Sequence, residues 1–277
     1  MTRKQMLQSL TPPLLWKQLR FLRQKLLPSR GFSYAPNGWA TPLPRGCHTS
    51  EYWIAFIDKE RSECESLIAQ IQAGLVLDGG EGVKHLVFGY VMAIAARNRD
   101  RIAVLDYGAN LGDFYWLARS IVPDVELEYH CKELLEVAAA GQHVTPAATW
   151  HTDDRCLDRS YDLVMFSSSL QYLPDWQGVL GRAARSSGGY LFLSDVPTVR
   201  SAPTFAALER SAGMTNVHHQ LNRTDILQVV AAEGLELRRE FTMSPHPFID
   251  GAPEQPTRVG WLFARPVQPR RGASNPA

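Results

Sequence analysis

Short apolar segments alternate with helix-like segments along most of the chain from residue 101 onward. Seven apolar segments have the length and composition of buried strands, and they cover residues 102–106, 125–131, 147–151, 161–166, 190–194, 235–241 and 258–264. Strands that alternate with helices predict βαβ units and a mainly parallel sheet. A loop, and no helix, is expected between the last two strands. The pattern therefore predicts a doubly wound α/β domain with a seven-stranded sheet.

Two helices are predicted before this sheet. Residues 50 to about 73 and residues 84 to about 97 both carry helical periodicity, and the second segment is nearly apolar all round. Such helices are expected to pack on the sheet. The chain then divides into a helix and loop extension (1–49), a main domain with leading helices (50–265) and a disordered tail rich in Pro, Arg and Gly (266–277).

The extension begins with a predicted amphipathic helix. Thr11 has the position of an N-cap and Pro12 that of the first helical residue, and the helix is expected to end near Pro28. Four leucines fall on one face and basic residues lie opposite or beside it. These leucines are Leu15, Leu19, Leu22 and Leu26. Residues 31–46 are rich in Gly, Pro and aromatics, which predicts a loop over the domain surface.

Composition narrows the class of protein. The 277 residues are 45% hydrophobic and 21% charged, as in an ordinary globular protein with a sizeable core. No apolar run approaches the roughly 18 residues that span a bilayer, and the first ten residues lack the apolar block of a signal peptide, so a cytoplasmic location is expected. The four cysteines show no metal-ligand spacing, which favours reduced, mostly buried thiols and predicts no metal site.

Charge is unevenly distributed although the net charge is only +1. The first fifty residues contain eight Lys or Arg and no Asp or Glu, which indicates an acidic partner or surface. The remainder has balanced charge and no stripe of basic residues interleaved with aromatics. Nucleic acid is therefore not an expected partner.

A glycine-rich turn follows the first strand of the predicted sheet. The strand ends at Asp106, and Gly108 and Gly112 come directly before a helix-like segment. A strand-to-helix turn at this edge of a parallel sheet presents backbone N–H groups to a ligand, and glycine permits a close approach. The spacing GxxxG differs from the GxGxxG of dinucleotide sites. A tight turn in some other α/β enzyme remains the alternative interpretation.

A second acid is expected about twenty residues farther along, where a carboxylate can accept ribose hydroxyls. Glu133 lies twenty-one residues after Gly112 and directly follows the second strand, so we favour it over Glu128 and Glu136. Asp153 follows the third strand, where a carboxylate can accept the amino group of adenine. A solvated turn capped by Asp153 explains the same residue equally well.

Several segments together resemble one known family. They are LTPP (10–13), LDYGANLG (105–112), YDLVMF (161–166), SLQYL (169–173) and QLN (220–222). These segments are similar to the TIGR-type S-adenosylmethionine-dependent class I methyltransferases associated with cell-surface polysaccharide gene clusters, over roughly residues 30–265. The resemblance implies a Rossmann-like sheet of seven strands, S-adenosylmethionine as cofactor and a sugar, glycan-related or other small acceptor.

The resemblance also implies which residues hold the cofactor. They are Asp106, Gly108, Ala109, Asn110, Gly112 and Glu133. Independently of the resemblance, the small residues Ser167 and Ser168 after the fourth strand leave room for the sulfonium and methyl group, and ordinary loop chemistry explains them as well. Two residues depart from the usual pattern. Asn110 replaces a glycine that is common at this position in methyltransferases. The replacement is a small departure, because Asn tolerates unusual backbone angles. Lys132 could form an ion pair with Glu133 and weaken the ribose contact.

Transfer of a methyl group to a hydroxyl requires positioning and a base. His218 and His219 lie in an insert after the fifth strand, and Tyr172 follows the serines, so these three are the catalytic candidates, with His246 as a further histidine. The histidines are expected in loops at the cofactor edge of the sheet. A lone loop histidine is more often solvated or a cap, and this reading stays open.

Two other function classes stay open. One is a nucleotide-binding α/β enzyme of another class, such as an oxidoreductase, and the other is an inactive methyltransferase-like assembly partner. The leucine face of residues 11–27 must also be covered, either by the domain itself or by anionic lipid. The acid-free N-terminus favours lipid, which predicts peripheral association with the inner face of the membrane.

Overall fold

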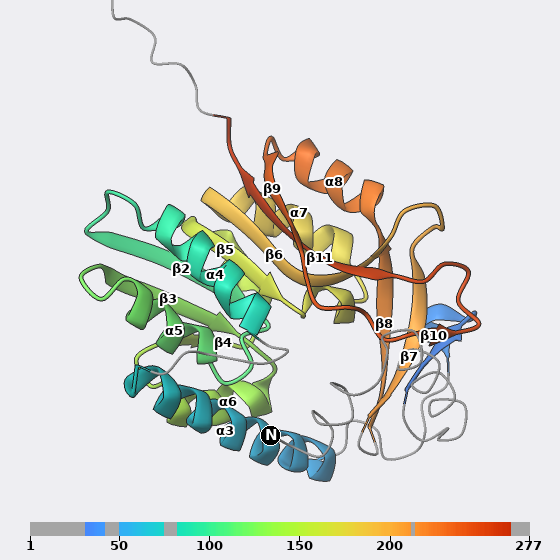
Figure 1. Ribbon diagram of the computed structural model, residues 1–277, viewed down its shortest axis with the longest axis horizontal. Helices are drawn as coiled ribbons and strands as arrows, with labels where there is room; N and C mark the ends of the chain where they lie inside the picture. Colours follow the sequence, from blue (N-terminus) through green and yellow to red (C-terminus); the bar gives the residue numbers. More distant parts are fainter. Residues whose placement is uncertain (1–30, 42–49, 75–81, 212–213, 267–277) are drawn as a thin grey trace, which may run out of the picture.

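A seven-stranded sheet forms the centre of the protein in the computed structural model (Figure 1). The structure describes residues 31–41, 50–74, 82–211 and 214–266. The side chains of residues 50–56, 82, 211 and 214 are not described. The strands are β2 (Arg101–Tyr107), β3 (Glu126–Lys132), β4 (Thr149–His151), β5 (Tyr161–Ser167), β6 (Ser187–Val199), β9 (Glu236–Thr242) and β11 (Thr257–Ala264). Their spatial order is β4-β3-β2-β5-β6-β11-β9, and β2 to β6 run parallel, whereas β11 is antiparallel to both neighbours. All seven predicted strands are confirmed, as is the doubly wound, mainly parallel seven-stranded sheet.

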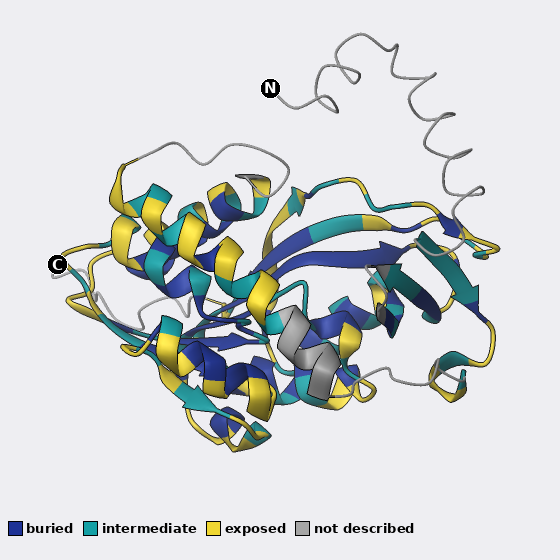
Figure 2. Cartoon of the chain, turned by 90° about the horizontal axis from the view of Figure 1, so that it is seen from below, coloured by how far each residue is buried: buried dark blue, intermediate teal, exposed yellow. Residues whose placement is uncertain are grey.

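Helices cover both faces of this sheet. They are α4 (Gly82–Ala95), α5 (Asp113–Ile121), α6 (Leu135–Val144), α7 (Trp176–Ser186) and α8 (Arg223–Ala232). α3 (Ser50–Gln72) packs mainly on α5 and α6, so the expectation that it packs on the sheet is wrong. α4 and α5 bury Phe88 and Phe114 against one face, and α7 and α8 bury Leu180 and Ile226 against the other. Figure 2 shows the buried strands between helices whose outer faces are exposed. This burial of both faces explains why the central strands are continuously apolar.

Side-chain caps fix the starts of two helices. Asp175 caps α7 and accepts a hydrogen bond from the backbone N–H of Gly178 at 3.0 Å. Asn222 caps α8 through the N–H of Thr224 at 2.8 Å.

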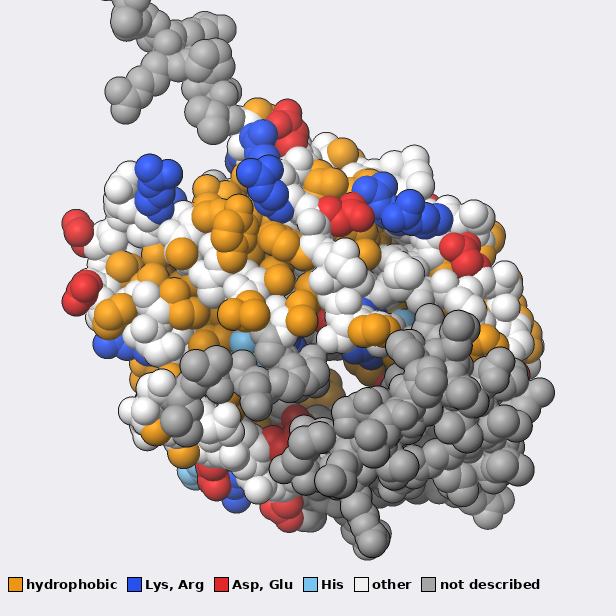
Figure 3. Space-filling model, in the orientation of Figure 1, with side chains coloured by type: hydrophobic (Ala, Val, Ile, Leu, Met, Phe, Trp, Pro, Cys, Tyr) orange, Lys and Arg blue, Asp and Glu red, His pale blue; other side chains and the backbone are white. Residues whose placement is uncertain are grey.

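The nearly apolar helix α4 also exposes hydrophobic side chains at the surface. Leu86 is 74% exposed, and hydrophobic side chains gather over this region in Figure 3.

A second group of strands lies beside the main sheet and was not predicted. This accessory sheet consists of β1 (Gly31–Ala35), β7 (Phe205–Ser211), β8 (Met214–Asn222) and β10 (Ile249–Asp250), in the order β10-β1-β7-β8. β8 joins it to the main sheet through β6, where Thr198 pairs with Leu221. The expectation of loops at 31–35 and in the insert after the fifth predicted strand is therefore wrong. Both faces of β8 carry polar residues, so its pattern lacks the apolar alternation that marks a strand.

The remaining expectations concern the termini and the cysteines. Cys64, Cys131 and Cys156 are free and buried, as predicted. Among the described residues, no helix is long and apolar enough to cross a membrane. The predicted helix at 11–27 and the predicted tail beyond residue 266 lie outside the described residues.

Candidate functional site

The loop between β2 and α5 passes three times through left-handed backbone conformations. The φ angles are +80° at Gly108, +52° at Asn110 and +84° at Gly112. Asn is one of the few residues other than Gly that adopts this region at low cost, so the expectation for Asn110 is confirmed. The loop therefore turns sharply at the carboxyl edge of the sheet, which is where ligands bind in open α/β folds.

Protein side chains, and not open space, face both glycines. A Cβ atom on Gly108 would lie 2.3 Å from the Cβ of Ser169, and one on Gly112 would lie 2.9 Å from Thr145 Oγ1. The Ser169 hydroxyl also donates to the carbonyl of Tyr107 at 2.6 Å. The glycines were expected to permit the close approach of a ligand, whereas in the structure they let the loop pack on Ser169 and Thr145.

Glu133 lies directly against this loop. Its Oε1 accepts the backbone N–H of Asn110 at 2.9 Å, and its Oε2 accepts the N–H of Leu134 at 2.8 Å. Burial raises the pKa of Glu133, and these two backbone hydrogen bonds oppose that rise. Each carboxylate oxygen can accept a second hydrogen bond. The carboxylate therefore keeps acceptor capacity beside the loop.

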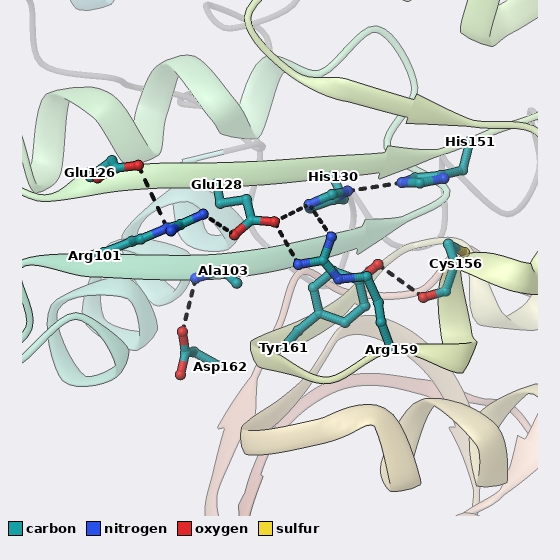
Figure 4. Close-up of polar contacts among 10 residues, drawn as sticks. All are labelled: Arg101, Ala103, Glu126, Glu128, His130, His151, Cys156, Arg159, Tyr161 and Asp162. Carbon is teal, nitrogen blue, oxygen red and sulfur yellow. Dashed lines mark hydrogen bonds and ion pairs between the residues drawn. The ribbon is translucent and has the colours of Figure 1, made fainter.

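The rival acid Glu128 is engaged elsewhere (Figure 4). It accepts hydrogen bonds from Arg101 at 2.6 Å and from Arg159 at 2.5 Å, and it contacts His130 at 3.0 Å. The hydrogen bonds of His130 and Arg159 are the main reasons that the pKa of Glu128 falls to about 2. Glu136, the other rival, is exposed in the first turn of α6. Of the three acids, only Glu133 contacts the loop.

Lys132 does not form the expected ion pair with Glu133. Its Nζ lies 4.8 Å from the ring centroid of Tyr107 and 3.7 Å from Oδ1 of Asp154. The same Asp154 oxygen accepts the Tyr107 hydroxyl at 2.6 Å. Lys132 is the last residue of β3 and its side chain takes the opposite direction from that of Glu133, as alternation along a strand requires. Lys132 therefore acts on Glu133 only at a distance, where its charge partly offsets the rise that burial causes in the pKa of Glu133.

Asp153 is the N-cap of a short 3-10 helix (Asp154–Asp158). Its carboxylate accepts the backbone N–H of Arg155 at 3.0 Å and the guanidinium of the same residue at 2.7 Å. The side chain is about half exposed. This geometry matches the alternative given above, a solvated turn capped by Asp. A cleft runs beside it, lined in part by Trp150 and Thr152.

A buried carboxyl group lies under the loop. Asp106 is fully buried, its Oδ2 accepts the Tyr129 hydroxyl at 3.1 Å, and its Oδ1 has no hydrogen-bond partner. Burial raises its pKa well above the usual value, and the nearby charges of Asp113 and Glu133 raise it further. Burial also raises the pKa of Asp113, which Lys84 partly offsets. Such a group of acids favours a ligand with positive charge.

Besides Thr145, sequence reasoning missed Glu60, which also contacts the loop. Glu60 of α3 accepts the side-chain amide of Asn110 at 2.6 Å. Cys64, one helical turn later, packs with Leu111 and Val137 in a small apolar cluster. α3 therefore holds the outer side of the loop. The amphipathic pattern of residues 50–73 indicated a packed helix but not what it contacts.

The neighbouring strand ends hold a second polar group. Ser167 ends β5, and Ser168 has a φ of +53° and donates its hydroxyl to Asp195 Oδ2 at 2.9 Å. Arg258 of β11 donates to the same oxygen at 2.6 Å. Asp195 itself has a φ of +56° and lies where the β6–β11 register shifts opposite Gly260. Such bulges often re-aim side chains next to active sites.

Aromatic rings adjoin this polar group. The ring centroid of His218 lies 5.6 Å from that of Tyr172, 6.4 Å from that of His246 and 5.4 Å from that of Phe32. The Tyr172 hydroxyl donates to Glu209 at 2.8 Å. Burial, followed by the charges of His246 and Arg258, lowers the pKa of His218 to about 3. His218 is therefore a neutral hydrogen-bonding ring near pH 7 and a weak base.

The expected loop position of His218 and His219 is wrong, because both lie on β8. Successive side chains of a strand point to opposite faces, and the two histidines are separated accordingly. His219 accepts the indole N–H of Trp39 at 2.6 Å, whereas His218 faces Tyr172. The structure brings two of the three catalytic candidates together. Asp195, Arg258 and Gln220 adjoin them and were not predicted.

Comparison with solved structures finds methyltransferases at low sequence identity. Magnesium protoporphyrin IX methyltransferase from Synechocystis PCC 6803, with bound SAH, is 14% identical, with 77% of this chain and 99% of that chain covered and a TM-score of 0.48. The amino pentose methyltransferase CalS10 from Micromonospora echinaspora, with bound SAM, is 15% identical, with 66% and 90% covered and a TM-score of 0.46. The sugar N-methyltransferase KedS8 from Streptoalloteichus sp. is 20% identical, with 66% and 87% covered and a TM-score of 0.42. Such values say nothing about the acceptor of this chain.

Comparison with curated proteins finds no significant match. The model of a methyltransferase domain family, in contrast, matches residues 80–240, which run from α4 to β9 and include the loop, Glu133, Ser168 and Asp195. This match covers more than half of the chain. The protein therefore belongs to this family of methyltransferase domains and is an S-adenosylmethionine-dependent methyltransferase with a class I fold.

Proposed function

We propose that the protein binds S-adenosylmethionine between the 108–112 loop and Glu133 and methylates a sugar, glycan-related or other small acceptor beside Ser168. The observation that carries this proposal is the contact of Glu133 with the N–H of Asn110, which joins the acid after β3 to the loop after β2. A ribose hydroxyl pair at this point has a carboxylate acceptor with free lone pairs.

The described residues fit a cationic cofactor. Asp106 Oδ1 is buried without a hydrogen-bond partner, and burial together with the charges of Asp113 and Glu133 raises the pKa of Asp106. A positive charge nearby stabilises their ionised forms. When bound, S-adenosylmethionine supplies an electrophilic methyl group on a sulfonium. In this proposal Glu133 holds the ribose, Asp106, Gly108 and Ala109 line the pocket, and Glu60 positions the loop through Asn110.

The proposed acceptor site lies beside Ser167 and Ser168. Ser167 and Ser168 follow β5 with small side chains, and Ser168 connects to Asp195. His218 and Tyr172 are proposed to position the acceptor rather than to remove its proton fully, because an imidazole with so low a pKa gains little by accepting a proton at neutral pH. His219 contributes to this edge less directly, because its side chain bonds to Trp39.

A deletion strain tests the proposal in the cell. We expect its cell-surface polysaccharide to lose a methyl substituent, detected by mass spectrometry, and the wild-type gene to restore it. A gene with Glu133→Ala should restore it poorly, whereas Glu136→Ala should restore it fully, because Glu136 is exposed on α6. Unchanged methylation in the deletion strain would contradict a surface-glycan acceptor.

We further propose that residues 11–27 associate with anionic lipid, where a lipid-linked glycan would be found. The support is the sequence alone, with eight basic and no acidic residues among the first fifty. Each basic residue near such a surface contributes about 1 kcal/mol of attraction. The test is sedimentation of the full chain and of a chain starting at Gly31 with anionic vesicles at low and high salt. Equal pelleting of both, or of neither, would contradict it.

A further inference from the structure

A cluster of buried polar side chains lies where the accessory sheet meets the ends of β5 and β6. We call it the acceptor cluster, and it consists of Gln171, Asp195, His218, Gln220, His246 and Arg258. His218 and Gln220 lie on the same face of β8, two residues apart, and their side chains are 3.3 Å apart at the closest nitrogen atoms. Gln171 belongs to the 3-10 helix (Leu170–Tyr172) that follows the serines. Five separate segments of the chain therefore build this cluster.

The cluster is connected to the proposed methyl-transfer edge through Ser168. The side-chain amide of Gln171 donates to the Ser168 carbonyl at 2.9 Å, and the Ser168 hydroxyl donates to Asp195 at 2.9 Å. Arg258 joins from β11 through its bond to Asp195 at 2.6 Å. A molecule held by the cluster is thus placed beside the residues that follow β5.

Five buried polar atoms of the cluster have no hydrogen-bond partner among the described residues. They are Gln171 Oε1, Asp195 Oδ1, Gln220 Oε1, His246 Nε2 and Arg258 Nε. Gln171, Asp195 and Gln220 are each more than nine-tenths buried. Buried polar groups are normally paired, because an unpaired one loses the hydrogen bonds it made to water. Such a concentration in one place indicates a site for a ligand rich in hydrogen-bonding groups.

Four of the five atoms are acceptors. His246 Nδ1 contacts the carbonyl of Pro247 at 2.6 Å, and a carbonyl only accepts, so Nδ1 carries the proton of a neutral ring and Nε2 accepts. The three side-chain oxygens of Gln171, Asp195 and Gln220 also accept. Arg258 Nε is the one donor of the five. Hydroxyl groups match this set, because each can donate to an acceptor and accept from a guanidinium.

The lowered pKa values of the two histidines show that this cluster disfavours a positive charge. Burial, the charge of Arg258 and the neighbouring histidine lower the pKa of His218 to about 3, and burial and Arg258 lower that of His246 to about 4. A protonated amine would meet the same burial and the same guanidinium. The one carboxylate of the cluster, Asp195, is already paired with Arg258 at 2.6 Å. An uncharged ligand therefore fits better than a cationic one.

We infer that the acceptor cluster binds an uncharged polyhydroxylated ring, such as a neutral sugar, in preference to an amino sugar or a sugar acid. The inference rests on the proposed function, because it names the acceptor of that same edge. The hydroxyls donate to Gln171, Asp195 and Gln220, and one of them accepts from Arg258. Tyr172, stacked on His218, offers an aromatic ring that is 38% exposed for the apolar face of the sugar.

Saturation-transfer NMR on the full chain saturated with SAH tests this inference. The probes are methyl hexopyranosides, the corresponding 2-amino sugars and the corresponding methyl hexuronosides, mixed at equal concentration. We expect transfer to the neutral glycosides to exceed transfer to the other two classes at least threefold. Equal or stronger transfer to the amino sugars or the uronosides, or no transfer to any neutral glycoside, would overturn the inference.

Two variants locate the binding. Gln220→Leu and Gln171→Leu keep the side-chain volume and should each reduce transfer to the neutral glycosides at least fivefold, with unchanged SAH affinity by calorimetry. The control is Ser33→Ala, because Ser33 bonds to Arg210 on the other face of the accessory sheet. If one variant fails to fold, the other carries the test. Loss of transfer in the control and not in the cluster variants would place the site elsewhere. Absence of SAH binding by the wild type would instead contradict the proposed function.

Discussion

Glu133 accepts the backbone N–H of Asn110 at 2.9 Å, so the acid after β3 is hydrogen-bonded directly to the loop after β2. Glu133→Ala should therefore weaken S-adenosylmethionine binding by about 1 to 3 kcal/mol, from lost hydrogen bonds to ribose and to the loop. Glu128→Ala should leave this affinity unchanged, because Glu128 is bound to Arg101 and Arg159. Calorimetric titration of both variants measures the difference, and the opposite ranking would move the ribose site to Glu128.

Gly112 is expected to resist substitution because of Thr145. A β-branched residue at a φ of +84° is strained, and its Cβ would lie 2.9 Å from Thr145 Oγ1. Gly112→Val should therefore abolish cofactor binding by displacing the loop. Because part of the clash is with a side chain, Gly112→Ala with Thr145→Ala should bind better than Gly112→Ala alone. Equal affinity of the single and double variants would show that backbone strain accounts for the whole effect.

The acids under the loop predict a pH-dependent preference for S-adenosylmethionine over SAH. The pKa values of Asp106, Asp113 and Glu133 are raised, mainly by burial. A carboxyl group whose pKa is raised in the folded protein contributes a stability that is fully present below its unfolded pKa near 4. This stability is lost as the pH rises through the folded pKa, because the buried group then ionises. In this pH range the positively charged sulfonium of S-adenosylmethionine stabilises the ionised acids, whereas the neutral sulfur of SAH does not.

The measurement is calorimetry with both ligands from pH 5 to pH 8. The ratio of the SAH dissociation constant to that of S-adenosylmethionine should rise with pH, and Asp113→Asn should flatten the rise. A ratio that falls with pH, or that does not change in the wild type, would contradict a role of these acids in binding the cation.

The buried histidines predict loss of stability in mild acid. His246 has a pKa lowered to about 4, mainly by burial, so the unfolded chain takes up its proton near pH 6.5 and the folded chain does not. This depressed pKa makes stability fall as pH drops from 6.5 toward 4. Between pH 7 and pH 5 the loss should be about 2 kcal/mol for this group. Urea unfolding of His246→Asn should show a smaller fall over the same range than the wild type.

The sequence predicted the main sheet because its strands are buried on both faces and read as apolar runs. It predicted Glu133 because the acid directly follows such a run. Gly108 and Gly112 were predicted as loop residues, but the reason for them, contact with Ser169 and Thr145, depends on residues distant in the chain. A single sequence does not show such pairs.

The accessory sheet and the acceptor cluster escaped prediction for a related reason. β8 carries His218 and Gln220 on one face and His219 on the other, so no apolar alternation marks it as a strand. Asp195 lies in a bulge within a longer strand, and its partner Arg258 is 63 residues away. A strand whose polar side chains pack against another part of the fold has the composition of a loop. The sequence pattern therefore predicts a loop at such a strand.

The central claim is that the 108–112 loop and Glu133 bind S-adenosylmethionine. The most direct measurement is calorimetric titration of S-adenosylmethionine into the full chain, beside Glu133→Gln and the surface control Glu136→Gln. The account predicts saturable binding to one site, at least fivefold weaker in Glu133→Gln and unchanged in Glu136→Gln. No binding by the wild type, or equal affinity in all three proteins, would contradict it.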